Sequence, residues 1–444
     1  MAGAAATKDM KSYGSAPGKW SAFARELLAT RKRPLLGSVD PSKFEEKARE
    51  KLKDYPDSFN FVFGYAGTGE TYRANRNEFA RWQIVPRMLR DVTHRDLSTT
   101  LFGVTYATPL LIAPIGCQTV MHADAECATA RAAGALGIPL VLSGAASRSL
   151  EQVAEANGPG SHRWFQLYWP LNEDITLSLL SRTKQSGYSA LVITVDTMAI
   201  GWRYLDLDSG YLPFAHGLGI QIALSDPKFM ELHGAGAAPH TDESEILPFP
   251  YDPAEIDKLV ASGDAHIKEM MRLAAAWGSE AVNGTFRTWQ DVRFLRKHWE
   301  GPLVVKGILS PEDAEIAIDE GIDGIIVSNH GGRQIDGSIS SLYALERIMQ
   351  SPIVKSAQAS NKFAVLMDGG IRSGADMLRA IALGAQAVLL GRTYAYGLAI
   401  AGQEGVEAVI KTILAEFELS LGLAGHKSVA DICGKAGEVT IKVG

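Results

Sequence analysis

Short apolar runs repeat along this 444-residue chain, and they constrain its fold more than any other feature. Each run lacks internal charge and ends in a small or polar group. Such runs are typical of strands buried on both faces, as in a parallel sheet covered by helices. The eight runs are LLIAPIG (110–116), PLVLSG (139–144), WFQLYW (164–169), ALVITVD (190–196), PLVVKG (302–307), GIIVSN (324–329), AVLMDGG (364–370) and AVLLGR (387–392).

Helical patterns lie between several of these runs, at residues 123–136, 310–320 and 373–383. The second pattern opens with Ser310-Pro311, a cap residue followed by proline at the first helical position. Eight strand–helix repeats predict an α/β fold, the (β/α)8 TIM barrel. The doubly wound alternative would require GxGxxG after the first strand, and the sequence lacks it.

The domain organisation follows from where the strand–helix repeats begin and where they are interrupted. Residues 1–37 are rich in Ala, Gly, Ser, Lys and Arg and predict a flexible tail with at most one helix. Residues 38–444 form the barrel domain, which begins with an amphipathic helical segment at 41–53. The fourth and fifth strands are separated by a long insertion at about 205–285, which we expect to be a lid over the site; a disordered decoration is the alternative.

Composition narrows the class of protein. A net charge of −6 argues against a nucleic-acid partner, and neither a secretory signal nor a membrane span is evident. Three cysteines are too few for a disulfide framework, and no metal-ligand motif is present. We therefore expect a cytoplasmic protein. A peroxisomal location stays open, although Lys442-Val443-Gly444 is no peroxisomal tripeptide.

The strand ends carry the candidate site residues, because barrel enzymes place their chemistry at the carboxyl ends of the strands. Convergence of these groups on one mouth is the functional interpretation. The residues are Gly116, Ser143, Gln166, Tyr168, Thr194, Asp196, Lys306, Ser328, His330, Asp368, Gly391 and Arg392.

The last two strands predict a phosphate site. The run DGGIRSG (368–374) contains Gly369, Gly370 and Arg372, and Gly391-Arg392 follows the eighth strand. Glycines let backbone N–H groups approach an anion, and arginines add bidentate charge. A phosphorylated cofactor or substrate is expected there.

A second group of residues suits a substrate that has a removable proton and a carboxylate. His330, in SNHGGRQ (328–334), is a candidate base, with Arg333 three residues on. Arg203 in GWR (201–203) offers a second carboxylate contact, and Asp196 could hold an imidazolium. Lys306 is open to three interpretations: a salt-bridged structural lysine, a Schiff-base nucleophile or a counter-ion to a developing anion.

Together these motifs resemble the FMN-dependent α-hydroxy acid dehydrogenase/oxidase family. The resemblance runs from about residue 40 to the C-terminus, and its lactate 2-monooxygenase branch is most similar. The motifs that carry it are RANxxxF near residue 73, APIG at 113, FQLYWP at 165, LVITVDT at 191, GWR at 201, SNHGGRQ at 328, DGGIR at 368 and GR at 391.

The resemblance implies FMN as the cofactor and assigns roles by position. Contacts to the isoalloxazine are implied for Pro114, Ile115, Gly116, Ser143, Gln166, Thr194 and Ser328. Contacts to ribityl and phosphate are implied for Asp368, Gly369, Gly370, Arg372, Gly391 and Arg392. Lys306 would stabilise the anionic reduced flavin. His330 would be the base, supported by Asp196, while Arg203 and Arg333 would bind the carboxylate and Tyr168 the hydroxyl.

Two departures from the family bear on the substrate. An alignment of Gly67-Thr68-Gly69 places Phe63 where the family has a carboxylate-binding tyrosine, with Tyr65 as a possible substitute after a local shift. Loss of that hydroxyl would weaken carboxylate binding by about 1 kcal/mol. Ala145 stands where glycolate oxidase has a tryptophan, which would admit a 2-hydroxy acid bulkier than glycolate.

The electron acceptor implied by the resemblance is O2, because no haem domain or membrane segment is evident. An oxidase, a lactate 2-monooxygenase and a dehydrogenase with another acceptor stay open, as do hydride and carbanion routes. The family also implies a homo-oligomer, a tetramer or an octamer. Two further classes are alternatives: a lyase that uses Lys306 as a Schiff base, and a catalytically dead binding barrel.

Overall fold

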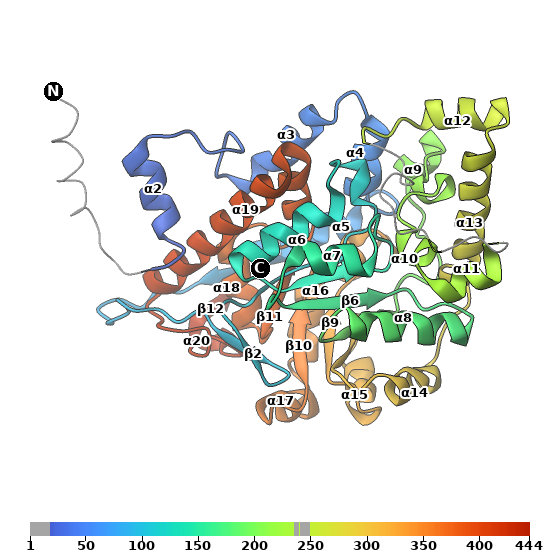
Figure 1. Cartoon of the computed structure of the whole chain (residues 1–444). Helices are drawn as coiled ribbons and strands as arrows, with labels where there is room; N and C mark the ends of the chain where they lie inside the picture. Colours follow the sequence, from blue (N-terminus) through green and yellow to red (C-terminus); the bar gives the residue numbers. More distant parts are fainter. Residues whose placement is uncertain (1–17, 235–238, 240–248) are drawn as a thin grey trace, which may run out of the picture.

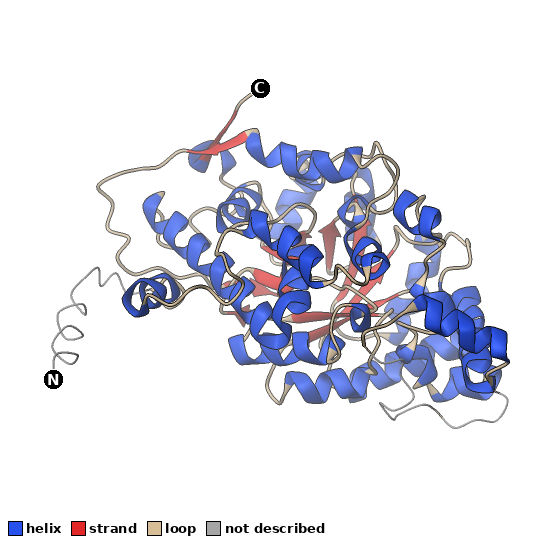
Figure 2. Ribbon diagram, turned by 90° about the horizontal axis from the view of Figure 1, so that it is seen from above, coloured by secondary structure: helices blue, strands red, loops and turns tan. Residues whose placement is uncertain are grey.

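A computed structural model describes residues 18–234, 239 and 249–444, and within them the chain forms a closed barrel of eight parallel strands. The strands follow the order β10-β11-β4-β5-β6-β7-β8-β9, and helices surround them (Figure 2). The predicted (β/α)8 barrel is confirmed. Its strands are β4 (Leu110–Ile112), β5 (Leu140–Ser143), β6 (Arg163–Leu167), β7 (Leu191–Thr194), β8 (Leu303–Ile308), β9 (Gly324–Val327), β10 (Ala364–Met367) and β11 (Ala387–Leu390).

The helices that follow the strands form at the predicted places. Ser310 caps α15 by accepting a hydrogen bond from the Asp313 N–H, and Ser373 forms a capping box with Asp376 in α18. The helices around the barrel are α6 (Ala125–Leu136), α7 (Leu150–Asn157), α8 (Glu173–Gln185), α14 (Trp289–His298), α15 (Pro311–Asp319), α16 (Ser341–Ile348), α17 (Pro352–Ala359), α18 (Gly374–Ala382) and α19 (Arg392–Leu423).

Side chains alternate between the two faces of each strand, and they pack into two separate cores. Inward side chains such as Trp164, Val192 and Val304 form one cluster, which the hairpin of β2 (Thr99–Leu101) and β3 (Val104–Tyr106) covers. Outward neighbours such as Phe165 and Val305 pack in a second cluster with the helices. The barrel interior is therefore filled, and ligands must bind at its mouth.

The N-terminal elements pack on the barrel domain. They are α2 (Ala22–Thr30), η2 (Pro41–Lys43), α3 (Phe44–Lys51), α4 (Pro56–Phe63) and α5 (Glu70–Ala80). Before α2, Trp20 is buried and the Ser21 N–H donates to Glu418 Oε2 at 2.6 Å. Near the other end, β12 (Thr440–Lys442) follows α20 (Ala436–Val439) and pairs antiparallel with β1 (Trp82–Ile84).

The insertion between β7 and α14 is helical where it is described, and its helices gather on one side of the barrel (Figure 1). Its stretch GAGAAPH (234–240) and the acidic run at 242–253 lie mostly outside the described residues, and its action as a lid stays a prediction. No helix in the described part of the chain is long and apolar enough to cross a membrane. The elements of the insertion are α9 (Tyr204–Ser209), η4 (Pro213–His216), α10 (Gln221–Leu224), α11 (Pro227–His233), α12 (Pro253–Ser262) and α13 (Ala265–Ala281).

Candidate active site

One ring of inward positions forms the floor of the site. Each strand places an apolar residue inside the barrel, and two residues later the next inward position lies at the mouth. The polar strand ends predicted from the sequence are therefore brought together under a cavity of about 620 Å³. The eight inward positions are Ala113, Ser143, Gln166, Thr194, Lys306, Ser328, Asp368 and Gly391.

Lys306 is a buried ammonium held by polar neighbours. Its Nζ donates to Ser328 Oγ at 3.1 Å and lies 3.6 Å from Asp368 and 3.9 Å from Asp196. Burial lowers the pKa of Lys306, but the carboxylates of Asp368 and Asp196 outweigh it and the pKa lies above its ordinary value. A lysine kept protonated suits a counter-ion and not a Schiff-base nucleophile.

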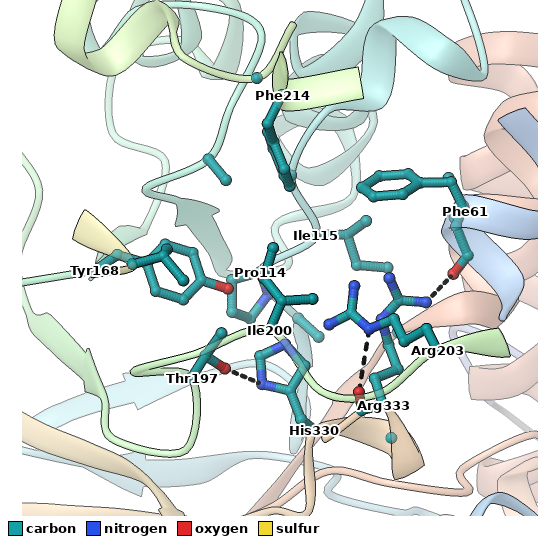
Figure 3. Close-up of a pocket in the computed structure, with 18 of the residues that line it drawn as sticks. Phe61, Pro114, Ile115, Tyr168, Thr197, Ile200, Arg203, Phe214, His330 and Arg333 are labelled. Atoms are coloured by element: carbon teal, nitrogen blue, oxygen red, sulfur yellow. Dashed lines mark hydrogen bonds between the residues drawn. The ribbon is translucent and has the colours of Figure 1, made fainter. Parts of the chain in front are cut away.

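His330 has the contacts of a general base. Its Nδ1 lies 2.7 Å from Asp196 Oδ1 and 3.1 Å from Thr197 Oγ1 (Figure 3). Burial, aided by Lys306 and Arg203, lowers the pKa of the imidazole despite the opposing charge of Asp196. The ring is therefore neutral at pH 7, and contact with Asp196 through Nδ1 leaves Nε2 for a substrate. Its backbone holds a left-handed conformation at φ 57°, which is uncommon outside glycine and is concentrated at functional sites.

Arg203 and Arg333 place two guanidinium groups side by side in the cavity (Figure 3). Arg333 donates to the carbonyls of Val62 and Gly64 at 3.1 and 2.9 Å, and Arg203 donates to the Arg333 carbonyl at 3.1 Å. The Asp206 carboxylate lies 3.9 Å from the Arg203 guanidinium. Burial, with Arg203 and Arg392 nearby, lowers the pKa of Arg333 well below its ordinary value. A buried cation (Arg203) and a half-buried one (Arg333) with so little compensation form a binding site for an anion such as a carboxylate.

Tyr168 completes the polar side of the cavity. Its hydroxyl points toward the middle of the pocket (Figure 3). Burial raises the pKa of this phenol, so the hydroxyl keeps its proton at neutral pH and can both donate and accept a hydrogen bond.

The structure corrects the alignment near residue 63. Phe63 lies outside the cavity, where its ring is 4.5 Å from Tyr396, and Tyr65 stacks on Tyr72 at 5.2 Å. Phe61 lines the cavity instead (Figure 3). Two residues along a helix are about 200° apart around its axis, so Phe61 and Phe63 of α4 face nearly opposite sides. The cavity still receives a phenyl ring and no hydroxyl from this helix.

Ala145 lines the cavity as expected, and it also explains Gly116. A Cβ at Gly116 would lie 2.4 Å from the Ala145 carbonyl oxygen, closer than atoms can approach. The glycine therefore has a packing cause.

The cavity and the ring of strand ends beneath it contain donors that fit FMN. The buried Gln166 Nε2 and Arg392 Nε have no hydrogen-bond partner within the described chain. A Cβ at Gly391 would meet no atom within 4 Å, so the backbone there is open to a ligand. Gly369 and Gly370, at φ 95° and 89°, also line the cavity, as does Arg372. These groups fit a flavin with a phosphate near β10 and β11.

Three supporting residues were not predicted. Thr197 contacts the base, and Gln334 accepts from Arg203 at 3.0 Å while donating to the Asp196 carbonyl at 2.7 Å. Asn75 exchanges two 2.8 Å hydrogen bonds with Asn329, next to His330. Their signal was present in the motifs RAN, LVITVDT and SNHGGRQ, but only the fold shows which side chains meet.

Comparison with known proteins places this architecture in one family. The family model described as FMN-dependent dehydrogenase matches residues 48–437. The chain is 41% identical to the FMN-dependent alpha-hydroxy acid dehydrogenase qulF of Penicillium citrinum over 89% of each chain. It is 38% identical to the L-lactate oxidase of Lysinibacillus sphaericus over 87% of this chain and 89% of that one. The crystal structure of a mandelate oxidase matches with a TM-score of 0.71 at 33% identity, covering 91% of this chain and 99% of that one. The chain therefore belongs to the FMN-dependent α-hydroxy acid dehydrogenase family, and its cofactor is FMN.

Proposed function

We propose that the protein oxidises an L-2-hydroxy acid to the 2-oxo acid and passes the electrons to O2. One observation carries the proposal: His330, which contacts Asp196, faces the same cavity as Arg203 and Arg333. A 2-hydroxy acid carries its hydroxyl and its carboxylate on the same carbon. His330 can remove a proton from that carbon or from its hydroxyl, and the two arginines can bind the carboxylate. Relatives named L-lactate oxidase and mandelate oxidase support O2 as the acceptor.

The residues of the chain have separate tasks in this reaction. Arg203 and Arg333 bind the carboxylate and orient the substrate, and Tyr168 donates a hydrogen bond to the oxygen at C2. His330 takes a proton from the substrate, and Asp196 stabilises the imidazolium that forms. FMN, when bound, would supply the acceptor for the two electrons. Lys306 supplies a fixed positive charge at the barrel mouth, where negative charge develops.

The proposal is tested by mixing the purified yellow protein with L-lactate and larger L-2-hydroxy acids without oxygen, then admitting air. We expect the flavin absorbance to bleach and then to return with peroxide and the 2-oxo acid as products. Return of the colour with CO2 and the acid shortened by one carbon would assign the lactate 2-monooxygenase reaction instead. Return only with an added dye or quinone would exclude O2 as the acceptor.

A further inference from the structure

A second wall of the cavity is entirely apolar. The insertion contributes it from two segments, residues 212–220 and helix α13, and none of their side chains in the cavity carries a charge. We call the space bounded by this wall the apolar chamber. Its residues are Leu212, Phe214, Ala215, Gly219, Ile220, Met271, Ala274, Ala275, Trp277, Gly278, Ala281 and Val282.

Phe61 connects the apolar chamber to the carboxylate-binding arginines. The Arg333 guanidinium lies 5.8 Å from the centre of the Phe61 ring, and the Phe214 ring meets Phe61 edge-on at 5.5 Å. Figure 3 shows Phe61 next to both groups, with the two arginines below its ring and Phe214 beside it. A substrate whose carboxylate is bound by the arginines can therefore extend its side chain past Phe61 into the chamber.

Small residues on α13 leave room in the chamber. Ala274, Ala275, Gly278 and Ala281 recur at three- and four-residue spacing, so they share one helix face. A Cβ placed at Gly278 would meet no atom within 4 Å, although this position lines the cavity. Gly278 is itself exposed, so the space next to it is the open side of the chamber, where an added side chain can lie.

We propose that the apolar chamber binds an uncharged, branched aliphatic or aromatic side chain of the 2-hydroxy acid, so that such acids are better substrates than L-lactate. The inference rests on the proposed function. Each methylene removed from water favours binding by roughly fourfold. A charged side chain would lose its hydration in the chamber without gaining a partner, which excludes 2-hydroxy diacids.

The first arm of the test compares three substrates with the holoenzyme. L-Lactate, L-2-hydroxyisocaproate and L-3-phenyllactate are mixed with it anaerobically, and the rate of flavin bleaching is followed against concentration. We expect the second-order rate constant to be at least about tenfold larger for the two larger acids, within the range that extra methylenes give in apolar pockets.

The second arm fills the chamber. Gly278→Leu places a side chain in the open space, and we expect the preference for the larger acids over L-lactate to fall by about tenfold or more. Ser279→Leu is the matched control, because Ser279 is exposed on the same helix and does not line the cavity. It should leave the preference unchanged.

The outcomes separate the two proposals. Faster bleaching by L-lactate than by both larger acids would overturn the chamber inference and retain the proposed function. An unchanged preference in Gly278→Leu would also overturn the inference. If this variant slowed only reoxidation by an added quinone, the chamber would belong to the electron acceptor and the inference would be wrong. Bound FMN that no 2-hydroxy acid bleaches would overturn the proposed function itself.

Discussion

At the scale of single residues, the site depends on how charge is distributed around His330. Asp196 lies on one side of the imidazole and contacts Lys306 at longer range. Burial raises the pKa of Asp196, but the attraction to His330 when that ring is protonated, the charge of Lys306 and the hydrogen bonds from His330 and Thr197 together hold it well below its usual range. The carboxylate is therefore ionised and ready to stabilise an imidazolium, while the base itself stays neutral.

Replacement of the base tests its assigned role. His330→Ala should keep FMN bound, because the groups that fit the cofactor lie on other residues, but it should slow anaerobic bleaching by about 10²-fold or more. Rapid-mixing absorbance measures the rate, and the visible spectrum after gel filtration reports retention of FMN. Bleaching at the wild-type rate would remove His330 from the mechanism.

The pH dependence of the reaction follows from the lowered pKa of His330. The base must be neutral, so kcat/KM should rise with pH and reach half its maximum below pH 6.5, the ordinary histidine value. Asp196 raises the pKa of His330, so Asp196→Asn should move this rise to lower pH and reduce the plateau.

A pH profile of kcat/KM for both proteins measures the shift. A rise centred above pH 6.5 in the wild type, or a shift to higher pH in Asp196→Asn, would contradict the assignment.

Residue positions were predicted from the sequence where strand geometry decides them. Lys306 and Asp368 end buried strands, and the two-residue alternation alone directs them into the barrel mouth. The prediction that Phe63 lies at the substrate site was wrong, because the alignment used the glycines alone and ignored the helical period of the segment before them. That period, applied to 56–63, would have separated Phe61 from Phe63.

At the scale of elements, a pair of amides joins helix α5 to the loop that carries the base. Asn75 and Asn329 exchange hydrogen bonds, and Asn75 Oδ1 also accepts from the Ser341 N–H at 3.0 Å. Asn329 Oδ1 accepts from the Gly332 N–H at 3.1 Å. This network holds His330 in its left-handed conformation.

Truncation of one amide tests the network. Asn75→Ala removes the acceptor of the Ser341 N–H and one partner of each Asn329 amide atom, and it should lower the free energy of unfolding by about 2–4 kcal/mol. The loss should also slow flavin bleaching, because the base loses its support. Urea unfolding measures the first effect.

Asn77→Ala is the control, because Asn77 is exposed on the same helix. It should change stability by about 0.5 kcal/mol or less. Equal effects of the two substitutions would contradict a role for the network.

The strands and capped helices were predictable because their signals are local: uninterrupted apolar runs, Ser-Pro starts and Gly ends. The apolar chamber was not. Helix α13 carries an ordinary amphipathic pattern, and only its docking over the barrel mouth gives one face the role of a cavity wall.

At the scale of the whole molecule, two parts of the chain form the cavity: the barrel and the helical insertion. The barrel carries His330 and the residues that fit the cofactor, while the insertion supplies the apolar wall of the cavity. Family resemblance adds the prediction of a homo-oligomer. Light scattering coupled to gel filtration should give a mass close to four or eight times 47.8 kDa, and a monomer at micromolar concentration would contradict it.

The central claim is that this cavity removes a proton and two electrons from the same 2-hydroxy acid. Its most direct measurement is the visible spectrum of the yellow holoenzyme during anaerobic mixing with L-3-phenyllactate and with L-lactate. We predict that the flavin absorbance bleaches in the wild type, while His330→Ala keeps its colour on the same time scale. A wild-type spectrum that stays unchanged with every 2-hydroxy acid, in a protein with FMN bound, would contradict the account.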